Sequence, residues 1–176
     1  MSVSLLGAAA PGFDRPLAVL EACHGRIAKQ CDTLDKLLAH LVHGADAQAQ
    51  QAARAVLAYF DTAAVHHHDD EERNLFPLLE QAGAPGARDL VEALTLEHDE
   101  LALLWRRLRV ELLQIGSGAA SALDAALTHC FIALNRTHLE FENTHVLPLA
   151  RQVLGAAEIE RLGRAMAARR GVTFAL

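Results

Sequence analysis

Residues 66–77 read His-His-His-Asp-Asp-Glu-Glu-Arg-Asn-Leu-Phe-Pro, in which three histidines run directly into four acids and then an apolar end. Residues 138–148 read His-Leu-Glu-Phe-Glu-Asn-Thr-His-Val-Leu-Pro and repeat this skeleton 71 positions later. In both stretches a His lies four residues before a Glu, and a Pro lies six residues after that Glu. Because side chains four residues apart share one face of a helix, each stretch predicts half of a two-metal site inside a helical bundle.

The composition favours a helical protein of one domain. The chain has 176 residues, of which 52% are hydrophobic and 5% aromatic. This length allows a sizeable core, and the scarcity of aromatic and β-branched residues favours helices over sheets. The net charge of −6 argues against nucleic acid or an anionic membrane surface as a partner. The adjacent Arg169 and Arg170 are expected to lie in solvent at a helix end.

Cysteine usage and hydropathy favour a cytoplasmic location. Cys23, Cys31 and Cys130 are odd in number and show no Cys-x-x-Cys spacing, which is typical of a reduced intracellular protein. Residues 1–11 lack the basic start of a secretory signal. No apolar run approaches the roughly 20 residues that span a membrane, so no membrane segment is expected.

Apolar residues recur at helical spacing along most of the chain and predict four long helices and a short fifth. The expected bounds are Asp14 to Gly44, Asp46 to Gly83, Arg88 to Ile115, Ala119 to Leu154 and Ala156 to Arg169, with Asp14 and Asp46 as N-caps. Short loops between them predict an all-α, up-down-up-down four-helix bundle with a short C-terminal helix. The bundle domain should cover residues 14–170, between a loose arm (1–13) and an unanchored tail (171–176). Pro77 and Pro148 should each kink or end a helix.

Helical phase selects one histidine of the triplet. Neighbouring helix positions lie about 100° apart, so only one of the three His/acid pairs can point fully inward. The residues that share a helix face with His67 and Glu71 form an unbroken apolar stripe of Val56, Phe60, Ala64, Leu75 and Leu78. The helix face of His66 also carries Tyr59, Thr62 and Arg73, and the helix face of His68 also carries Asp61. His67 and Glu71 are therefore expected to face the core. Five other histidines are expected to face solvent: His40, His43, His66, His68 and His129.

The remaining helices complete the candidate site. His24 and His98 lie on the apolar stripes of the first and third predicted helices, and His138 and Glu142 lie on that of the fourth. A buried carboxylate without a partner costs several kcal/mol, and no Lys or Arg lies on these stripes near the two Glu. The candidate metal ligands are His24, His67, Glu71, His98, His138 and Glu142. A hydrogen-bonded polar core without metal is the structural alternative.

Coordination chemistry favours a pair of iron ions. If both Glu bridge and the four imidazoles divide equally, each ion receives two nitrogen and two oxygen donors. An oxo or hydroxo bridge would add one donor to each ion and leave one labile position on each. Imidazole with carboxylate in a bundle core suits iron, with Mn or Zn as possible substitutes. His145 lies on the same stripe as Glu142 and is expected at the surface or behind a ligand, while Cys31 and Trp105 are expected to pack in the core.

These residues resemble the hemerythrin-like (HHE cation-binding) family over about residues 16–152. The signatures are His67-x-x-x-Glu71-Glu72-x-x-Leu75-Phe76-Pro77, Glu97-His98-Asp99-Glu100 and His138-x-x-x-Glu142-Asn143-x-x-Val146-Leu147-Pro148. The resemblance implies a four-helix bundle around a non-haem di-iron centre that handles O2, nitric oxide or peroxide, or that senses iron or redox state. Respiratory members carry a further His four residues from the His of the third helix, where this chain has Leu94 and Ala102. Four His with two Glu is closer to the di-iron proteins that repair iron–sulfur clusters.

We therefore expect a cytoplasmic di-iron protein that binds or senses a small diatomic or peroxidic ligand such as O2, nitric oxide or H2O2. The alternative is a di-iron enzyme or repair factor in nitrosative or oxidative stress, which reduces nitric oxide or peroxide, oxidises Fe(II), or donates iron to iron–sulfur clusters. A third hypothesis is a stress-responsive interaction module. A homodimer is possible, and the sequence sets neither the oligomeric state nor the physiological ligand.

Overall fold

A computed structural model describes residues 10–174. The predicted arm (1–13) thus lies mostly outside the described residues, as do the last two positions of the predicted tail (171–176). Within the described range there are helices and no strand. The α-helices are α1 (Pro16–His40), α2 (Ala47–Phe60), α3 (Ala63–Asp70), α4 (Phe76–Gln81), α5 (Ala87–Gly116), α6 (Ala125–Phe141), α7 (Leu147–Val153) and α8 (Ala156–Arg169).

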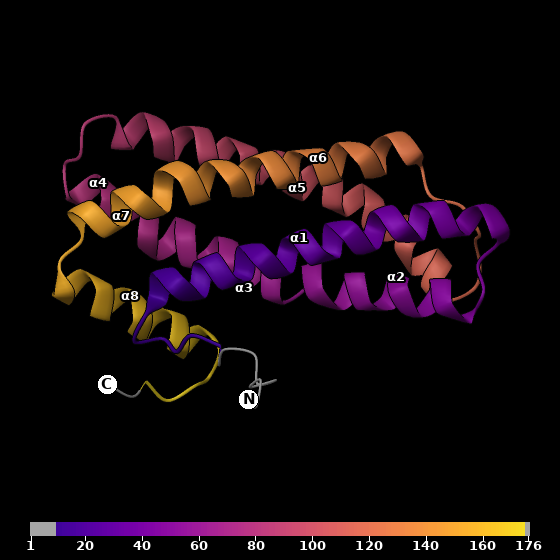
Figure 1. The fold of residues 1–176 in the computed structure, drawn as a ribbon, viewed down its shortest axis with the longest axis horizontal. Helices are drawn as coiled ribbons and strands as arrows, with labels where there is room; N and C mark the ends of the chain where they lie inside the picture. Colours follow the sequence, from indigo (N-terminus) through magenta and orange to yellow (C-terminus); the bar gives the residue numbers. More distant parts are fainter. Residues whose placement is uncertain (1–9, 175–176) are drawn as a thin grey trace, which may run out of the picture.

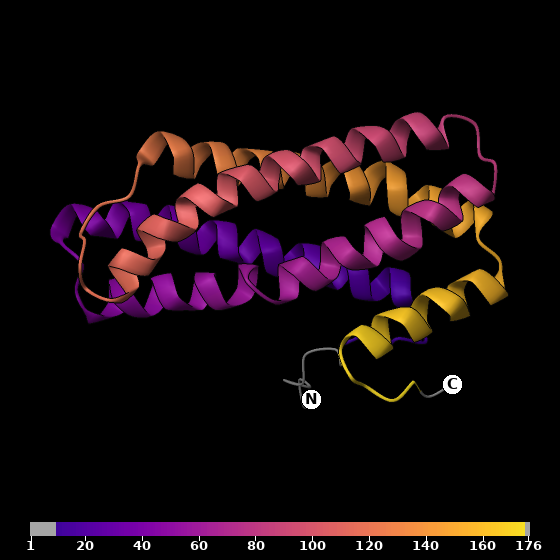
Figure 2. The same ribbon diagram turned by 180° about the vertical axis from the view of Figure 1, so that it is seen from behind.

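Four long helical arms lie side by side and form the body of the molecule (Figure 1). The arms are α1, the run from α2 to α4, α5, and the run from α6 to α7, and each packs against its chain neighbour while α1 also packs against α6. The predicted all-α, up-down-up-down bundle is confirmed. The short α8 lies against one side of the bundle, near the end formed by α4 and α7, and contacts α1 and α3, as Figure 2 shows from behind. None of the helices in residues 10–174 combines the length and apolar character of a membrane span.

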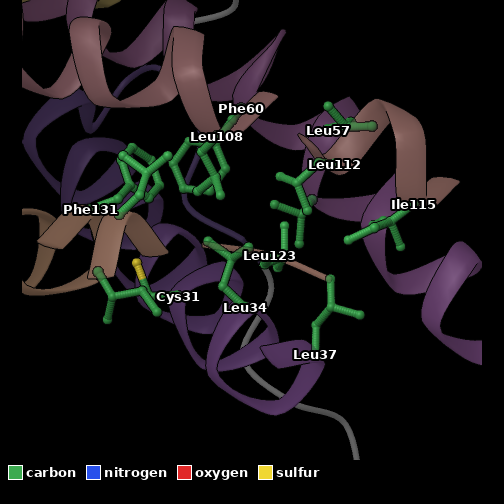
Figure 3. Close-up of a cluster of buried hydrophobic side chains, with 14 of the residues drawn as sticks. Cys31, Leu34, Leu37, Leu57, Phe60, Leu108, Leu112, Ile115, Leu123 and Phe131 are labelled. Carbon is green, nitrogen blue, oxygen red and sulfur yellow. The ribbon is translucent and has the colours of Figure 1, made fainter. Parts of the chain in front are cut away.

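Two clusters of buried apolar side chains fill the bundle on either side of a polar layer. The large cluster joins the later parts of α1 and α5 to α2 and α6, and Figure 3 shows Leu34, Phe60, Leu108 and Phe131 within it. The small cluster joins the first turns of α1 to α4, α7 and α8. Along every arm the change from one cluster to the other falls at the predicted metal ligands. The two apolar clusters therefore hold the polar layer at a fixed level of the bundle.

The second arm is not the single helix that periodicity predicts. Asp61 and Thr62 form a turn between α2 and α3. The Asp61 carboxylate accepts hydrogen bonds from Trp105 Nε1 and Arg109 Nε on α5, at 3.1 and 2.9 Å. The Thr62 hydroxyl donates to the Ala58 carbonyl oxygen, a contact that bends helices. Side-chain bonds to a neighbouring helix and to the preceding turn thus interrupt the helix.

Pro77 and Pro148 are each expected to kink or end a helix, and neither ends one, because a wide helical turn precedes each proline. Residues Glu71–Leu75 and Glu142–Val146 are π-helical, and the carbonyl of each leading Glu accepts from the N–H five residues later. Proline offers no N–H and its ring collides with the carbonyl four residues earlier. The wider turn shifts the hydrogen-bond pattern by one residue, so the helical chain continues through both prolines. Such π-turns are frequent at functional sites.

Two predicted helix starts are also corrected. α6 begins at Ala125 rather than near Ala119, because the Asp124 carboxylate accepts from Leu127 N and caps the helix. The position before α1 is Arg15, which makes no side-chain cap, so the predicted capping role of Asp14 is wrong. Pro16 supplies the fixed φ that suits a first helical position. The predicted N-cap Asp46 does accept a hydrogen bond from Ala49 N at 2.9 Å.

Arg169 and Arg170 do not lie free in solvent. Both pair with Asp70, which has no exposed side-chain surface, and the Arg170 Nη2 to Asp70 Oδ2 distance is 2.7 Å. Arg169 also donates to Asn74 Oδ1 at 2.7 Å. A buried carboxylate requires such partners. The two arginines therefore fasten α8 to the arm that carries His67 and Glu71.

We predict that replacing both arginines by alanine (Arg169→Ala with Arg170→Ala) lowers the free energy of unfolding by about 3–5 kcal/mol, because Asp70 is left buried and unpaired. Urea unfolding followed by circular dichroism measures this loss. The matched control is Arg136→Ala with Arg151→Ala, whose acidic partners are exposed and should contribute about 1 kcal/mol or less per pair. Equal losses in the two double variants would contradict the anchoring role.

Candidate metal centre

The polar layer brings together all six residues that the sequence singles out. None is more than 3% exposed. Each arm contributes at the level where the two apolar clusters meet. The contributions are His24 from α1, His67 from α3, Glu71 from the first π-turn, His98 from α5, His138 from α6 and Glu142 from the second π-turn.

Glu142 lies between histidines of two different arms. Its Oε2 is 3.2 Å from His24 Nε2, and its Oε1 is 3.4 Å from His138 Nε2. The two oxygens of one carboxylate thus face two different imidazoles. This is the arrangement that a carboxylate bridging two ions requires.

Glu71 occupies the equivalent position on the other side of the layer. Its Oε2 lies 3.4 Å from His67 Nε2 and 3.7 Å from His98 Nε2, and its Oε1 lies 3.7 Å from His24 Nε2. Glu71 therefore also reaches both halves of the layer. His24 and His67 belong to one half, and His98 and His138 belong to the other, where their Nε2 atoms are 3.0 Å apart.

Three residues at the edge of the layer fix the orientation of three of the four imidazoles, whereas His67 Nδ1 is buried without a hydrogen-bond partner. His98 Nδ1 donates to Glu72 Oε1, His138 Nδ1 donates to Glu97 Oε2, and His24 Nδ1 donates to Asn143 Oδ1, each at 2.7 Å. Glu72 and Asn143 each follow a buried Glu by one position. Each half of the layer therefore has an equivalent supporting contact. A second hydrogen bond of this kind orients metal-binding histidines.

These contacts leave His24 Nε2 without a hydrogen-bond partner, while His98 Nε2 and His138 Nε2 lie 3.0 Å from each other. A neutral imidazole that carries its proton on Nδ1 presents a lone pair at Nε2. Among residues 10–174, His24 Nε2, His67 Nε2 and both Glu142 oxygens are buried without a hydrogen-bond partner. Two ligands at right angles on one ion, each about 2.1 Å from it, lie about 3.0 Å apart. The spacing of His98 and His138 matches that value, so the layer fits metal.

Burial and mutual charge shift the pKa values in this layer. Burial, reinforced by the charge of Glu142, raises the pKa of Glu71 well above its usual range. Burial would also raise the pKa of Glu142, but contacts with His138 and His24 outweigh it and lower that pKa. The pKa of His67 is lowered well below its usual range by burial and by the neighbouring histidines. Neutral His67 is the form that binds metal.

His68 departs from the prediction that it faces solvent. Its ring is half-buried and stacks on the His98 ring, with centroids 4.1 Å apart and planes at 18°. Helical phase relates His68 to Asp61 only along an unbroken helix, whereas the turn at Asp61 and Thr62 interrupts the helix. Ala64, four residues before His68, is buried and is the signal in the sequence that could have identified its inward side.

The other histidines lie outside the layer. His145 is exposed, stacks on Phe141 and lies within hydrogen-bond distance of Thr144 Oγ1. His43 and His129 are exposed as expected, whereas His66 and His40 are half-buried, and His40 pairs with Asp46. The core positions expected for Cys31 and Trp105 agree with the structure, since both contact the large cluster. Burial raises the pKa of the Cys31 thiol to about 12.

Comparison with known proteins matches residues 15–150 to the hemerythrin HHE cation-binding domain. The chain belongs to the hemerythrin HHE cation-binding family. It is also 31% identical over 161 residues to an uncharacterized protein of Haemophilus influenzae, a match that covers 91% of this chain and 92% of that protein.

A cation-binding family implies a metal site, and the donor atoms of the polar layer form two groups that could hold one. One atom each from His24, His67, Glu71 and Glu142 lie within 4.8 Å of one another, and so do atoms from His68, His98 and His138. The carboxylates approach the second group as well, through the contacts of Glu71 with His98 and of Glu142 with His138. Nitrogen and carboxylate oxygen donors in this ratio could hold two cations, and they suit iron.

We predict that Glu71→Gln makes the metal-free protein more stable than the unmodified protein, by a difference that grows as the pH rises. Because the folded-state pKa of Glu71 is raised, its stability contribution is complete below its unfolded-state pKa and is lost as the pH rises through the folded-state pKa. Gln does not ionise and escapes this loss. The stability difference should grow above about pH 4.5 by at most about 1.4 kcal/mol per pH unit.

Urea unfolding of chelator-treated protein at several pH values measures this difference. The control is Glu100→Gln at an exposed position of α5, whose unfolding profile should run parallel to that of the unmodified protein. A parallel profile for Glu71→Gln would contradict the raised pKa.

Proposed function

We propose that this chain holds two iron ions between its four helical arms and binds a small diatomic or peroxidic ligand reversibly, as a carrier or sensor. The observation that supports this most is the placement of both buried carboxylates between the two histidine groups. Glu142 faces His24 with one oxygen and His138 with the other, and Glu71 faces His67 and His98. One ion would be held by each histidine group together with Glu71 and Glu142, and such a pair would give partners to His24 Nε2, His67 Nε2 and the Glu142 oxygens, which otherwise lack them.

Bound iron would supply a change of oxidation state and a coordination position that a small ligand can occupy. Mn or Zn could take the place of iron but would not supply all of its redox chemistry. The side chains of this protein set the conditions. Glu72, Glu97 and Asn143 keep the imidazole Nε2 atoms directed inward. Glu71 and Glu142 offset cationic charge, and the two apolar clusters keep bulk water away from the layer.

The burial of the layer limits the ligand to small molecules. Donors that are at most 3% exposed are out of reach of a peptide, a nucleic acid or a membrane, so O2, nitric oxide and H2O2 are the fitting class. We also place the protein in the cytoplasm, since a reducing compartment preserves Fe(II) and the free thiols of Cys23, Cys31 and Cys130.

We predict about two irons per chain after anaerobic addition of Fe(II), and optical changes with O2 or nitric oxide that reverse when the gas is removed. Glu142→Ala should lose at least half of the bound iron, because one bridge is gone. The control is Glu140→Ala, an exposed position on the same helix, which should keep both irons.

The outcome separates this function from its alternatives. A folded protein that takes up no Fe(II) would contradict the proposal. Iron binding with irreversible consumption of nitric oxide or peroxide, in the presence of a reductant, would instead support a di-iron enzyme.

A further inference from the structure

The outer face of α5 carries a row of apolar side chains that the rest of residues 10–174 leaves uncovered. Leu96, Leu103 and Val110 are 63%, 55% and 56% exposed. A single exposed apolar residue is ordinary on a protein surface, but these three recur every seven residues along one helix. That spacing keeps side chains on one face over many turns, as in helices that pack against each other. We call these three residues the α5 stripe.

Exposed charged residues border the α5 stripe on both flanks. Helical spacing places Asp99 and Arg106 on one flank and Glu100 and Arg107 on the other. None of the four forms an ion pair within residues 10–174, whereas Arg109 on the same helix pairs with Asp61. Both the stripe and its flanking charges therefore lack partners in the described part of the chain.

The charges are arranged symmetrically about Leu103. On each flank the acid precedes Leu103 by three or four residues, and the arginine follows it by three or four. When two such helices pack antiparallel about a two-fold axis at Leu103, like flanks face each other. Each acid then lies opposite an arginine of the second copy, Leu96 lies opposite Val110, and Leu103 lies opposite itself. The face is complementary to a second copy of itself.

A parallel arrangement of the two helices does not fit the same charges. In parallel helices opposite flanks face each other at the same level, so Asp99 would face Glu100 and Arg106 would face Arg107. Like charges brought together across an interface cost several kcal/mol. The charge pattern therefore selects the antiparallel arrangement.

The surface beside Leu103 is also shaped to receive a side chain. A groove there has walls that include Asp99, Ala102, Trp105 and Arg106. In a two-fold symmetric contact the same patch of both copies meets. Leu103 of each copy thus lies next to the groove of the other.

We infer that the chain forms a two-fold symmetric dimer in which the α5 stripes of two copies pack antiparallel, with the axis at Leu103. The paired charges on both flanks fix the direction and register of the two helices. The α5 stripe takes no part in the proposed metal layer, because His98 is buried on the inner side of the same helix. The dimer therefore forms whether or not the layer holds metal.

Sedimentation equilibrium of the full chain over a range of concentrations tests the dimer. The expected mass at high concentration is twice the chain mass of 19.0 kDa. Leu103→Asp should raise the Kd of the dimer by at least about 100-fold, because two carboxylates would face each other in the interface. The matched control is Val42→Asp at another exposed apolar position, which should leave the Kd unchanged. Circular dichroism of each variant should match that of the unmodified protein.

Charge reversal tests the contacts on the flanks. Arg106→Glu with Arg107→Glu should be monomeric, and so should Asp99→Arg with Glu100→Arg, because each places like charges across the interface. An equimolar mixture of these two double variants should form a dimer with one copy of each. A mixture that stays monomeric would contradict the assigned contacts.

Disulfide cross-linking tests the direction of the helices in a Cys130→Ser background, which removes the exposed thiol. Leu103→Cys should cross-link to itself under mild oxidation, whereas Leu96→Cys should cross-link only when it is mixed with Val110→Cys. Self-cross-linking of Leu96→Cys would indicate parallel helices and overturn the inference. An unmodified protein that stays monomeric, or a Leu103→Asp dimer as tight as that of Val42→Asp, would also overturn it.

Discussion

Two buried carboxylates that lie beside each other among histidines are the constraint on which the rest of the structure depends. The Glu71 and Glu142 side chains are each 1% exposed, and among residues 10–174 the basic groups within 4 Å of their oxygens are imidazoles. Ionised carboxylates in such surroundings cost several kcal/mol unless a cation neutralises them. A metal pair would resolve this, because it would bind both the carboxylate oxygens and the inward lone pairs of the imidazoles.

The fold is arranged to keep this unfavourable layer in place. Apolar clusters above and below it provide the burial free energy that offsets its cost, and the layer sits where each helical arm passes from one cluster to the other. Each π-turn begins at one of the buried Glu residues and is followed by a proline that it accommodates. The contacts of Glu72 and Asn143 with His98 and His24 repeat on the two sides. The internal repeat of the sequence therefore corresponds to a repeat of the structural features that support the layer, namely the π-turn that begins at each buried Glu and the contact that orients a histidine.

Periodicity was sufficient to predict the bundle and to bring the six layer residues together, because apolar spacing and the His-x-x-x-Glu pairs are local properties. Contacts between distant residues were not accessible in this way. The bond from Trp105 to Asp61 interrupts the second arm, and phase counting across that interruption placed His68 in solvent. The pairing of Asp70 with Arg169 and Arg170 joins residues about 100 positions apart. The local sequence around the two arginines therefore predicts only a solvated helix end.

The central claim is that two metal ions occupy the layer between the histidine groups. Anomalous diffraction from crystals of the iron-loaded protein, recorded on both sides of the iron absorption edge, tests it most directly. Two iron peaks are expected, one beside His24 and His67 and one beside His98 and His138, with Glu71 and Glu142 between them. A single peak, or no peak within this layer in protein that was exposed to Fe(II), would contradict it.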